Sequence, residues 1–204
     1  MEGVKVLKTD EKSIEMMKDL YADLLNSKIT RSRRSLESMK NQPKKEKQIT
    51  KEDLIARGVK HTNQYKYSNL IMPESMTIGT RWDYFKNEYV VSAHDKHNGT
   101  ELFDKCKSLT TYLANINDIS YNMNTATLNR NYKISKHLDR RNKNSSILIG
   151  FGDYEKGEIT IYDKKDISYN YDINMKPILF NGSDFYHEVI DFSGTRYSFV
   201  SYLI

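Results

Sequence analysis

The chain has 204 residues, of which 38% are hydrophobic and 29% are charged, and this balance is typical of one globular domain. Cys106 is the single cysteine, which excludes a disulfide framework and zinc sites built on two or four cysteines. No run of about eighteen apolar residues is present, and the charged N-terminal segment does not resemble a secretory signal. We therefore expect an intracellular monomer without membrane contacts, in the cytoplasm or nucleus, or in a host cytoplasm if a virus encodes it.

Positive charge is concentrated near the start of the chain. Residues 28–60 contain eleven Lys or Arg and four Asp or Glu, whereas the whole chain has a net charge of +5. This asymmetry favours an anionic partner, most simply nucleic acid, although a solvated helix surface has the same composition. The basic residues expected to contact a nucleic-acid backbone are Arg31, Arg33, Arg34, Lys40, Lys44, Lys45 and Lys47.

Two longer helices are predicted in the first part of the chain. Residues 11–28 have apolar side chains at spacings of three and four, namely Ile14, Met17, Leu20, Tyr21, Leu24 and Leu25. Residues 100–117 have a similar face, made of Leu102, Phe103, Cys106, Leu109, Leu113 and Ile116. A short helix is expected at 51–58, and residues 65–95 are expected to be mainly β because they are rich in tyrosine and other hydrophobic residues.

The second half of the chain has the pattern of short strands. From about residue 119, apolar and aromatic runs alternate with Gly, Asn and Asp turns, as in SSILIGFG, GEITIYD, KPILFNG and RYSFVSYLI. Several such runs at close spacing predict an antiparallel sandwich or barrel. We therefore predict a single α+β domain over 1–204, with a basic helical extension at 1–60, a mixed α/β support at 61–118 and the β core at 119–204.

Three residues of the β region are candidate metal ligands. His137 and Asp139 are two residues apart, and side chains at i and i+2 of a strand point to the same face. His187, fifty residues later, is the candidate third ligand. Two imidazoles and one carboxylate on one face form the facial triad of non-haem Fe(II) oxygenases, which leaves positions open for an oxoacid and O₂. A lone His-x-Asp is more often a surface pair, so the pattern needs further support.

Arg196 and Ser198 supply that support. If Ser193 and Gly194 form a two-residue turn, Arg196 pairs with Asp191 and His187 shares an inward face with Arg196 and Ser198. A guanidinium there can bind a carboxylate through two hydrogen bonds, which suits the distal carboxylate of 2-oxoglutarate. The alternative is that Arg196 is neutralised by Asp191 at a strand end.

These residues carry a family resemblance over about residues 122–204. The pattern His137-x-Asp139, then His187 and Arg196-x-Ser198, resembles the signature of Fe(II)/2-oxoglutarate-dependent dioxygenases. Finer features are similar to the TET/JBP branch of nucleic-acid base oxygenases: Asn142, Ile149-Gly150-Phe151-Gly152-Asp153-Tyr154, Gly157-Glu158, Phe180-Asn181-Gly182 and Gly194-Thr195-Arg196-Tyr197-Ser198.

The resemblance implies a fold, an activity and its cofactors. The fold is a double-stranded β-helix, or jelly-roll, with flanking N-terminal helices. The activity is hydroxylation of the methyl group of a pyrimidine base, 5-methylcytosine or thymine, in nucleic acid, with DNA as the expected partner. Fe(II) is the metal, 2-oxoglutarate the cosubstrate and O₂ the oxidant.

Further roles follow from the same resemblance. Asn129 and Tyr132 are similar to residues that contact the cosubstrate in the related AlkB branch. Asn142 is the candidate that reads the flipped base, although Asn is also a common turn residue. Arg140 and Arg141 would contact backbone phosphates or lie in a solvated turn, and Tyr186 would stack on a base or pack in the core.

Other functions remain open from the sequence. An AlkB-like nucleic-acid demethylase and a protein or small-molecule hydroxylase share the same signature, although prolyl hydroxylases of that group usually carry Lys where Arg196 stands. From another class, an inactive nucleic-acid-binding module would keep the fold, but it would not need the triad of His137, Asp139 and His187.

Overall fold

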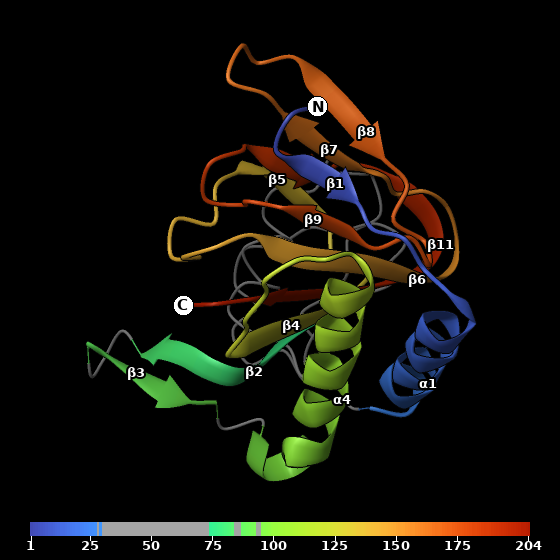
Figure 1. The fold of residues 1–204 in the computed structure, drawn as a ribbon, viewed down its shortest axis with the longest axis vertical. Helices are drawn as coiled ribbons and strands as arrows, with labels where there is room; N and C mark the ends of the chain where they lie inside the picture. The colour runs from blue at the N-terminus through green and yellow to red at the C-terminus, as the bar shows by residue number, and fades with distance from the viewer. Residues whose placement is uncertain (28, 30–73, 84–86, 93–94) are drawn as a thin grey trace, which may run out of the picture.

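The computed structural model describes residues 1–27, 29, 74–83, 87–92 and 95–204 (Figure 1). In chain order the elements are β1 (Val4–Val6), α1 (Glu11–Asn26), β2 (Glu74–Asp83), β3 (Glu88–Val91), α4 (Asp95–Ile116), β4 (Thr125–Arg130), β5 (Ile134–His137), β6 (Ser146–Lys156), β7 (Ile159–Tyr162), β8 (Ser168–Tyr171), β9 (Ile178–Phe180), β10 (His187–Val189) and β11 (Phe192–Tyr202). The helix expected at 51–58 and the seven basic residues from Arg31 to Lys47 lie outside the described residues.

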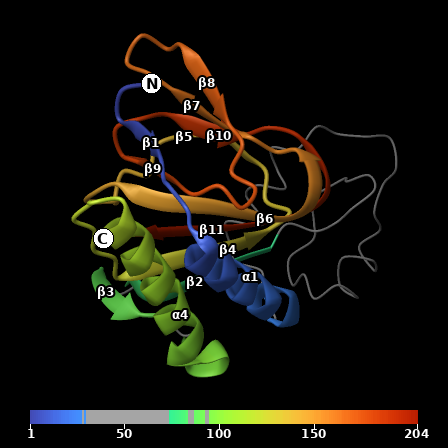
Figure 2. The same ribbon diagram turned by 45° about the vertical axis from the view of Figure 1, so that its right-hand side comes forward.

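The strands form two antiparallel sheets. A seven-stranded sheet has the order β1-β9-β6-β11-β4-β2-β3, and a four-stranded sheet has the order β5-β10-β7-β8. The small sheet and the two helices lie on opposite sides of the large sheet (Figure 2). This arrangement confirms the predicted α+β class with a double-stranded β-helix core and flanking helices.

The helix expected at 11–28 is confirmed as α1. Asp10 caps it, because its side chain accepts a hydrogen bond from the backbone N–H of Ser13 at 2.8 Å while the Ser13 hydroxyl accepts one from the backbone N–H of Asp10 at 2.8 Å. Met17, Leu20 and Leu24 are buried, as the apolar spacing predicts. α4 begins at Asp95, somewhat earlier than expected, and buries Leu102, Cys106, Leu109 and Leu113.

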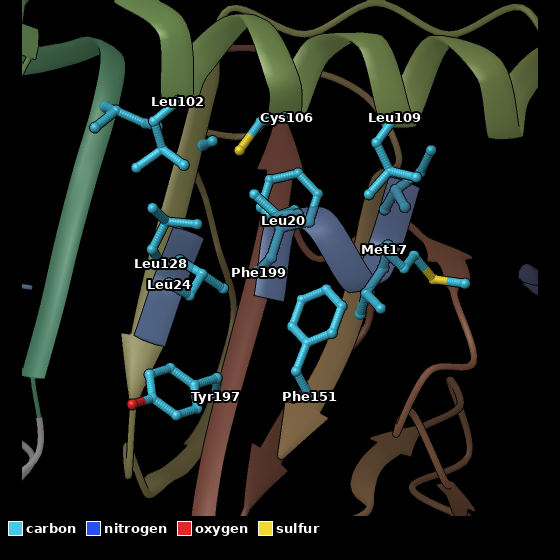
Figure 3. Close-up of a cluster of buried hydrophobic side chains, with 14 of the residues drawn as sticks. Met17, Leu20, Leu24, Leu102, Cys106, Leu109, Leu128, Phe151, Tyr197 and Phe199 are labelled. Atoms are coloured by element: carbon cyan, nitrogen blue, oxygen red, sulfur yellow. The ribbon is translucent and has the colours of Figure 1, made fainter. Parts of the chain in front are cut away.

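One hydrophobic core lies between these helices and the large sheet (Figure 3). Leu20 and Leu24 of α1 and Leu109 of α4 pack in the same cluster as Phe151 of β6 and Phe199 of β11. Each of these side chains is at most 1% exposed, and full burial of one such side chain contributes about 1.5–3 kcal/mol to folding. The helices therefore support the large sheet from the face opposite the small sheet.

A second core lies between the two sheets and determines where the functional residues point. Leu148 and Phe180 of the large sheet pack with Ile161 and Val189 of the small sheet. Because side chains alternate along β11, Tyr197 and Phe199 face the helices while Arg196 and Ser198 face the space between the sheets.

The expected hairpin at Ser193 and Gly194 is wrong. β11 runs through both residues and pairs with β6, where Ser193 lies opposite Glu155 and Gly194 opposite Tyr154. Gly194 has φ +87, which suits a turn, but here it permits close approach, because a Cβ would lie 2.3 Å from the Asp153 carbonyl oxygen. β10 belongs to the other sheet, so the predicted register between β10 and β11 does not exist.

The segments before residue 119 also contribute strands to the large sheet. β1 pairs with β9 at its edge, although the sequence did not predict this short strand, and β2 pairs with β4. The division at 60 and 118 stays a prediction. Among the described residues, no helix is long and apolar enough to cross a membrane.

Candidate metal centre

The three predicted ligands converge. One ligand atom each from His137, Asp139 and His187 lies within 4.8 Å of the other two. His137 ends β5, His187 begins β10, and the two residues are paired across the ladder between these strands. Nε2 of His137 lies 3.6 Å and Nε2 of His187 lies 3.5 Å from the Asp139 carboxylate oxygens. The donor set is two nitrogens and one oxygen on one side, which fits Fe(II).

Backbone carbonyls orient both imidazoles. Nδ1 of His137 lies 2.9 Å from the carbonyl oxygen of Ser135, and Nδ1 of His187 lies 3.0 Å from that of Phe185. When Nδ1 carries the proton and donates it to the carbonyl, Nε2 presents its lone pair toward the other ligands. The carbonyls therefore hold each ring in the orientation that a metal ligand requires.

Asp139 is positioned by a loop rather than by a strand. It lies two residues beyond the end of β5, and its backbone N–H donates to the carbonyl of Gly182 at 2.8 Å. Burial alone would raise the pKa of this carboxyl, but hydrogen bonds and attraction from His137 and His187 lower its pKa below the usual range. The carboxyl is therefore ionised and can bind a cation.

The absence of a side chain at Gly182 leaves space beside the triad. A Cβ there would lie 3.2 Å from Oδ2 of Asp139 and 3.4 Å from Cε1 of His187. The Phe180 and His187 rings meet in a T-shaped contact with 5.1 Å between their centroids. The Phe180-x-Gly182 pair therefore shapes the wall of the metal centre.

Arg196 is a buried cation that faces the same interior. It is 2% exposed, and its Nε donates to the carbonyl of Gly157 at 3.1 Å. Asp191, the alternative partner considered from the sequence, pairs instead with Lys133 at 3.1 Å and with Lys156 at 3.5 Å. Among the described residues, no carboxylate forms an ion pair with Arg196, and burial lowers the pKa of its guanidinium. The site thus holds a positive charge suited to an anionic ligand.

Tyr154 is a site residue that the sequence analysis missed. Its ring centroid lies 5.6 Å from the Arg196 guanidinium carbon, and its buried hydroxyl has no hydrogen-bond partner within the described part of the chain. A Cβ on Gly150 would lie 2.5 Å from that hydroxyl, so the glycine makes room for it. Burial raises the pKa of Tyr154, which keeps the hydroxyl a neutral donor. The signal in the sequence was alternation: Gly150, Gly152 and Tyr154 share the inward face of β6.

The remaining cosubstrate candidates lie on the inner face or near it. Asn129 and Ser198 are opposite each other in the ladder between β4 and β11, and Asn129 donates to the Ser198 hydroxyl at 3.3 Å. Tyr132, just beyond the end of β4, is 8% exposed. The structure therefore brings Asn129 and Ser198 together.

The substrate candidates fall into buried and exposed groups. Asn142 is 8% exposed and donates to the Ser146 hydroxyl at 3.1 Å, so its amide is already used in part by the fold. Arg140 and Arg141, which directly follow Asp139, are exposed. Tyr186, which directly precedes His187, is 44% exposed and is therefore not a core residue.

Comparison with known proteins gives matches by structure alone. No family model and no curated protein matches the chain. A prolyl hydroxylase from Trichoplax adhaerens, solved with a hypoxia inducible factor peptide, has a TM-score of 0.54 at 13% identity over 99% of this chain and 84% of that one. The thymine 7-hydroxylase of Neurospora crassa, solved with alpha-KG (2-oxoglutarate) and thymine, has a TM-score of 0.50 at 14% identity over 98% and 75%.

A 2OG-Fe(II) oxygenase family structure from Burkholderia pseudomallei matches with a TM-score of 0.44 at 15% identity. That match covers 64% of this chain and 65% of the other, just under two thirds of its length. The TM-scores of 0.54 and 0.50 concern structures that are aligned over nearly all of this chain. The chain therefore has the double-stranded β-helix fold of the 2OG-Fe(II) oxygenases.

Proposed function

We propose that this protein is an Fe(II)/2-oxoglutarate-dependent dioxygenase that hydroxylates the methyl group of a pyrimidine base, 5-methylcytosine or thymine, in nucleic acid. One observation carries the cofactor assignment: a candidate metal centre and a buried cation face the same space between the two sheets. A triad of His137, Asp139 and His187 lies there, and the buried cation Arg196 faces the same space without a carboxylate partner among the described residues.

The triad residues are suited to hold Fe(II) on one side. Both histidines present Nε2, and the carboxylate of Asp139 supplies a negative charge next to the cation. When bound, the iron supplies the redox chemistry with 2-oxoglutarate and O₂. The protein's part is to fix the ligands, exclude water and orient the methyl group.

Arg196, Tyr154 and Ser198 are suited to bind the distal carboxylate of 2-oxoglutarate. A buried charge without a partner costs several kcal/mol, which a bound carboxylate would offset. The Tyr154 hydroxyl is available as a donor beside the guanidinium, while Ser198 lies on the same face of β11 as Arg196. Asn129, opposite Ser198, would orient the cosubstrate from β4, together with Tyr132 just beyond the end of that strand.

The substrate class is supported by residues that adjoin the ligands in sequence. The exposed Arg140 and Arg141 follow Asp139, and the exposed Tyr186 precedes His187, so basic and aromatic groups flank the metal centre. Phosphate contacts and base stacking need these groups when a base is flipped out of a duplex. Asn142 is the proposed base reader, and residues 28–60 would add phosphate contacts.

Succinate release with a panel of substrates tests the assignment. The panel contains DNA and RNA oligonucleotides with thymine, 5-methylcytosine or an N-methylated base, together with a proline peptide, and products are identified by mass spectrometry. We expect a hydroxymethyl pyrimidine from the wild type and none from His137→Ala. Formaldehyde from the N-methylated base would indicate an AlkB-like demethylase, and peptide turnover a protein hydroxylase. Nucleic-acid binding without succinate from any substrate would indicate an inactive module.

A further inference from the structure

Glu188 connects three strands on the outer face of the small sheet. It follows His187 in β10, so its side chain points away from the metal centre while that of His187 points toward it. One carboxylate oxygen accepts a hydrogen bond from the Tyr162 hydroxyl on β7. The other accepts one from the backbone N–H of Lys136 on β5, at 3.1 Å. Strands β7 and β5 are the two neighbours of β10.

The contact with β5 occurs where the ladder is irregular. His187 is opposite His137, and Val189 is opposite Ile134. Between these pairs β10 has one residue, Glu188, whereas β5 has two, Ser135 and Lys136, so β5 contains a β-bulge. A bulge leaves backbone groups out of the regular ladder. In the part of the chain that the structure describes, β5 is an edge strand whose one neighbour is β10. The Glu188 carboxylate therefore replaces a ladder bond that the bulge removes.

The bulge also contains the groups that orient a metal ligand. Lys136 directly precedes His137, and the carbonyl of Ser135 lies 2.9 Å from Nδ1 of His137. A displacement of this backbone would therefore shift both the His137 side chain and the carbonyl that orients its ring. The other two ligands do not depend on the bulge in this way, because His187 is paired with β7 and the backbone of Asp139 bonds to Gly182.

We propose that Glu188 is a positioning residue for the metal centre: by holding the β5 bulge through its backbone, it fixes the first histidine ligand, His137. This inference rests on the proposed function insofar as it requires a metal at the triad. Tyr162 contributes to the same arrangement, because its hydroxyl donates a hydrogen bond to the Glu188 carboxylate. The Lys136 ammonium lies 3.6 Å from the centroid of the Tyr162 ring and pairs with Asp166, which holds the ring against the strand.

Titration of the metal-free full chain with Co(II), followed by its visible absorption, tests the proposal. We expect Glu188→Ala to weaken Co(II) binding by about 10–100-fold, the usual effect of removing a group that orients a ligand. Glu188→Gln should bind within about threefold of the wild type, because its amide oxygen can still accept from Lys136 and its nitrogen can donate to Tyr162. Glu155→Ala is the matched control, since Glu155 is an exposed residue of β6 with the same charge. It should leave the affinity unchanged.

Tyr162→Phe keeps the inference testable if Glu188→Ala does not fold. It removes the hydroxyl that donates to Glu188 and should weaken Co(II) binding less than Glu188→Ala does. Its circular dichroism spectrum and its melting temperature without metal should stay close to those of the wild type. Unchanged Co(II) affinity in folded Glu188→Ala, or in Tyr162→Phe if the former does not fold, would overturn the positioning role. An equal loss in Glu155→Ala would show a simple charge effect and would overturn it as well. Failure of the wild type itself to bind Co(II) would instead refute the proposed metal centre.

Discussion

Replacement of Arg196 tests whether this arginine binds a ligand or only stabilises the fold. In Arg196→Met the buried cation disappears while most of the side-chain volume stays. Two opposing effects then act on the free energy of unfolding without ligand. The carbonyl of Gly157 loses its donor, which costs about 1–3 kcal/mol, whereas removal of an unpaired buried charge stabilises by about 1–4 kcal/mol. We therefore expect a net change between about 2 kcal/mol of destabilisation and about 3 kcal/mol of stabilisation.

The effect on 2-oxoglutarate binding should be much larger. Each hydrogen bond to a charged group contributes about 1.5–3 kcal/mol, so loss of a bidentate contact costs at least about 3 kcal/mol, or more than 100-fold in Kd. At a concentration of 100 times the wild-type Kd, the ligand stabilises the wild type by about 2.7 kcal/mol but Arg196→Met by at most about 0.4 kcal/mol. Arg196→Lys keeps the charge but loses the planar pair of N–H donors that binds a carboxylate through two hydrogen bonds. We therefore expect an intermediate loss of about tenfold in affinity for 2-oxoglutarate.

The assay is thermal unfolding with Mn(II), with and without 2-oxoglutarate, under nitrogen. Arg130→Met is the matched control, because Arg130 is on the neighbouring strand β4, is 42% exposed and pairs with Glu74 at 3.5 Å. This control should keep the full ligand-induced stabilisation. If Arg196→Met also keeps it, or if Arg196→Met unfolds without ligand, the arginine is structural and the cosubstrate assignment fails.

Two further outcomes follow from the structure and a third from the sequence. Tyr154→Phe removes a buried hydroxyl that has no partner among the described residues, so the free energy of unfolding without ligand should not change. Thermal shifts should show that 2-oxoglutarate binds about tenfold more weakly, because one hydrogen bond to it is lost. Asn142→Ala should reduce base oxidation by about 1–3 kcal/mol and spare uncoupled 2-oxoglutarate decarboxylation, and equal loss of both would mark Asn142 as structural. Neutralising Arg31, Arg33 and Arg34 together should weaken nucleic-acid binding for all sequences and reduce the slope of log affinity against log salt by up to about three, and an unchanged slope would make them a solvated surface.

Local patterns predicted the elements that carry the site. The apolar spacing of Met17, Leu20 and Leu24 is a property of one helix, and the alternation around Ile149 and Phe199 is a property of single strands. Such signals do not depend on which strands become neighbours. The chain from 119 onward therefore indicated a β core correctly before any pairing was known.

Pairing between distant strands was not accessible in the same way. Ser193-Gly194 has turn chemistry, but Gly194 lies against β6 and β11 continues through it as one long strand. Tyr154 was missed for a related reason, since its importance comes from Arg196, which lies forty-two residues away and on a different strand. No local pattern singled out Glu188, because its partners Lys136 and Tyr162 come from two other strands.

Arg196 points inward, as predicted, although it does not pair with Asp191 as the predicted register required. The side-chain face of a residue depends on its parity within its own strand, whereas its partner depends on the order of strands in the sheet. In a double-stranded β-helix the two sheets face each other, so inward residues of β10 and β11 meet across the interior instead of along a ladder. The same parity sends Glu188 outward next to the inward His187. Alternation thus places the ligand on one face of β10 and, by our inference, the group that positions its neighbour His137 on the other.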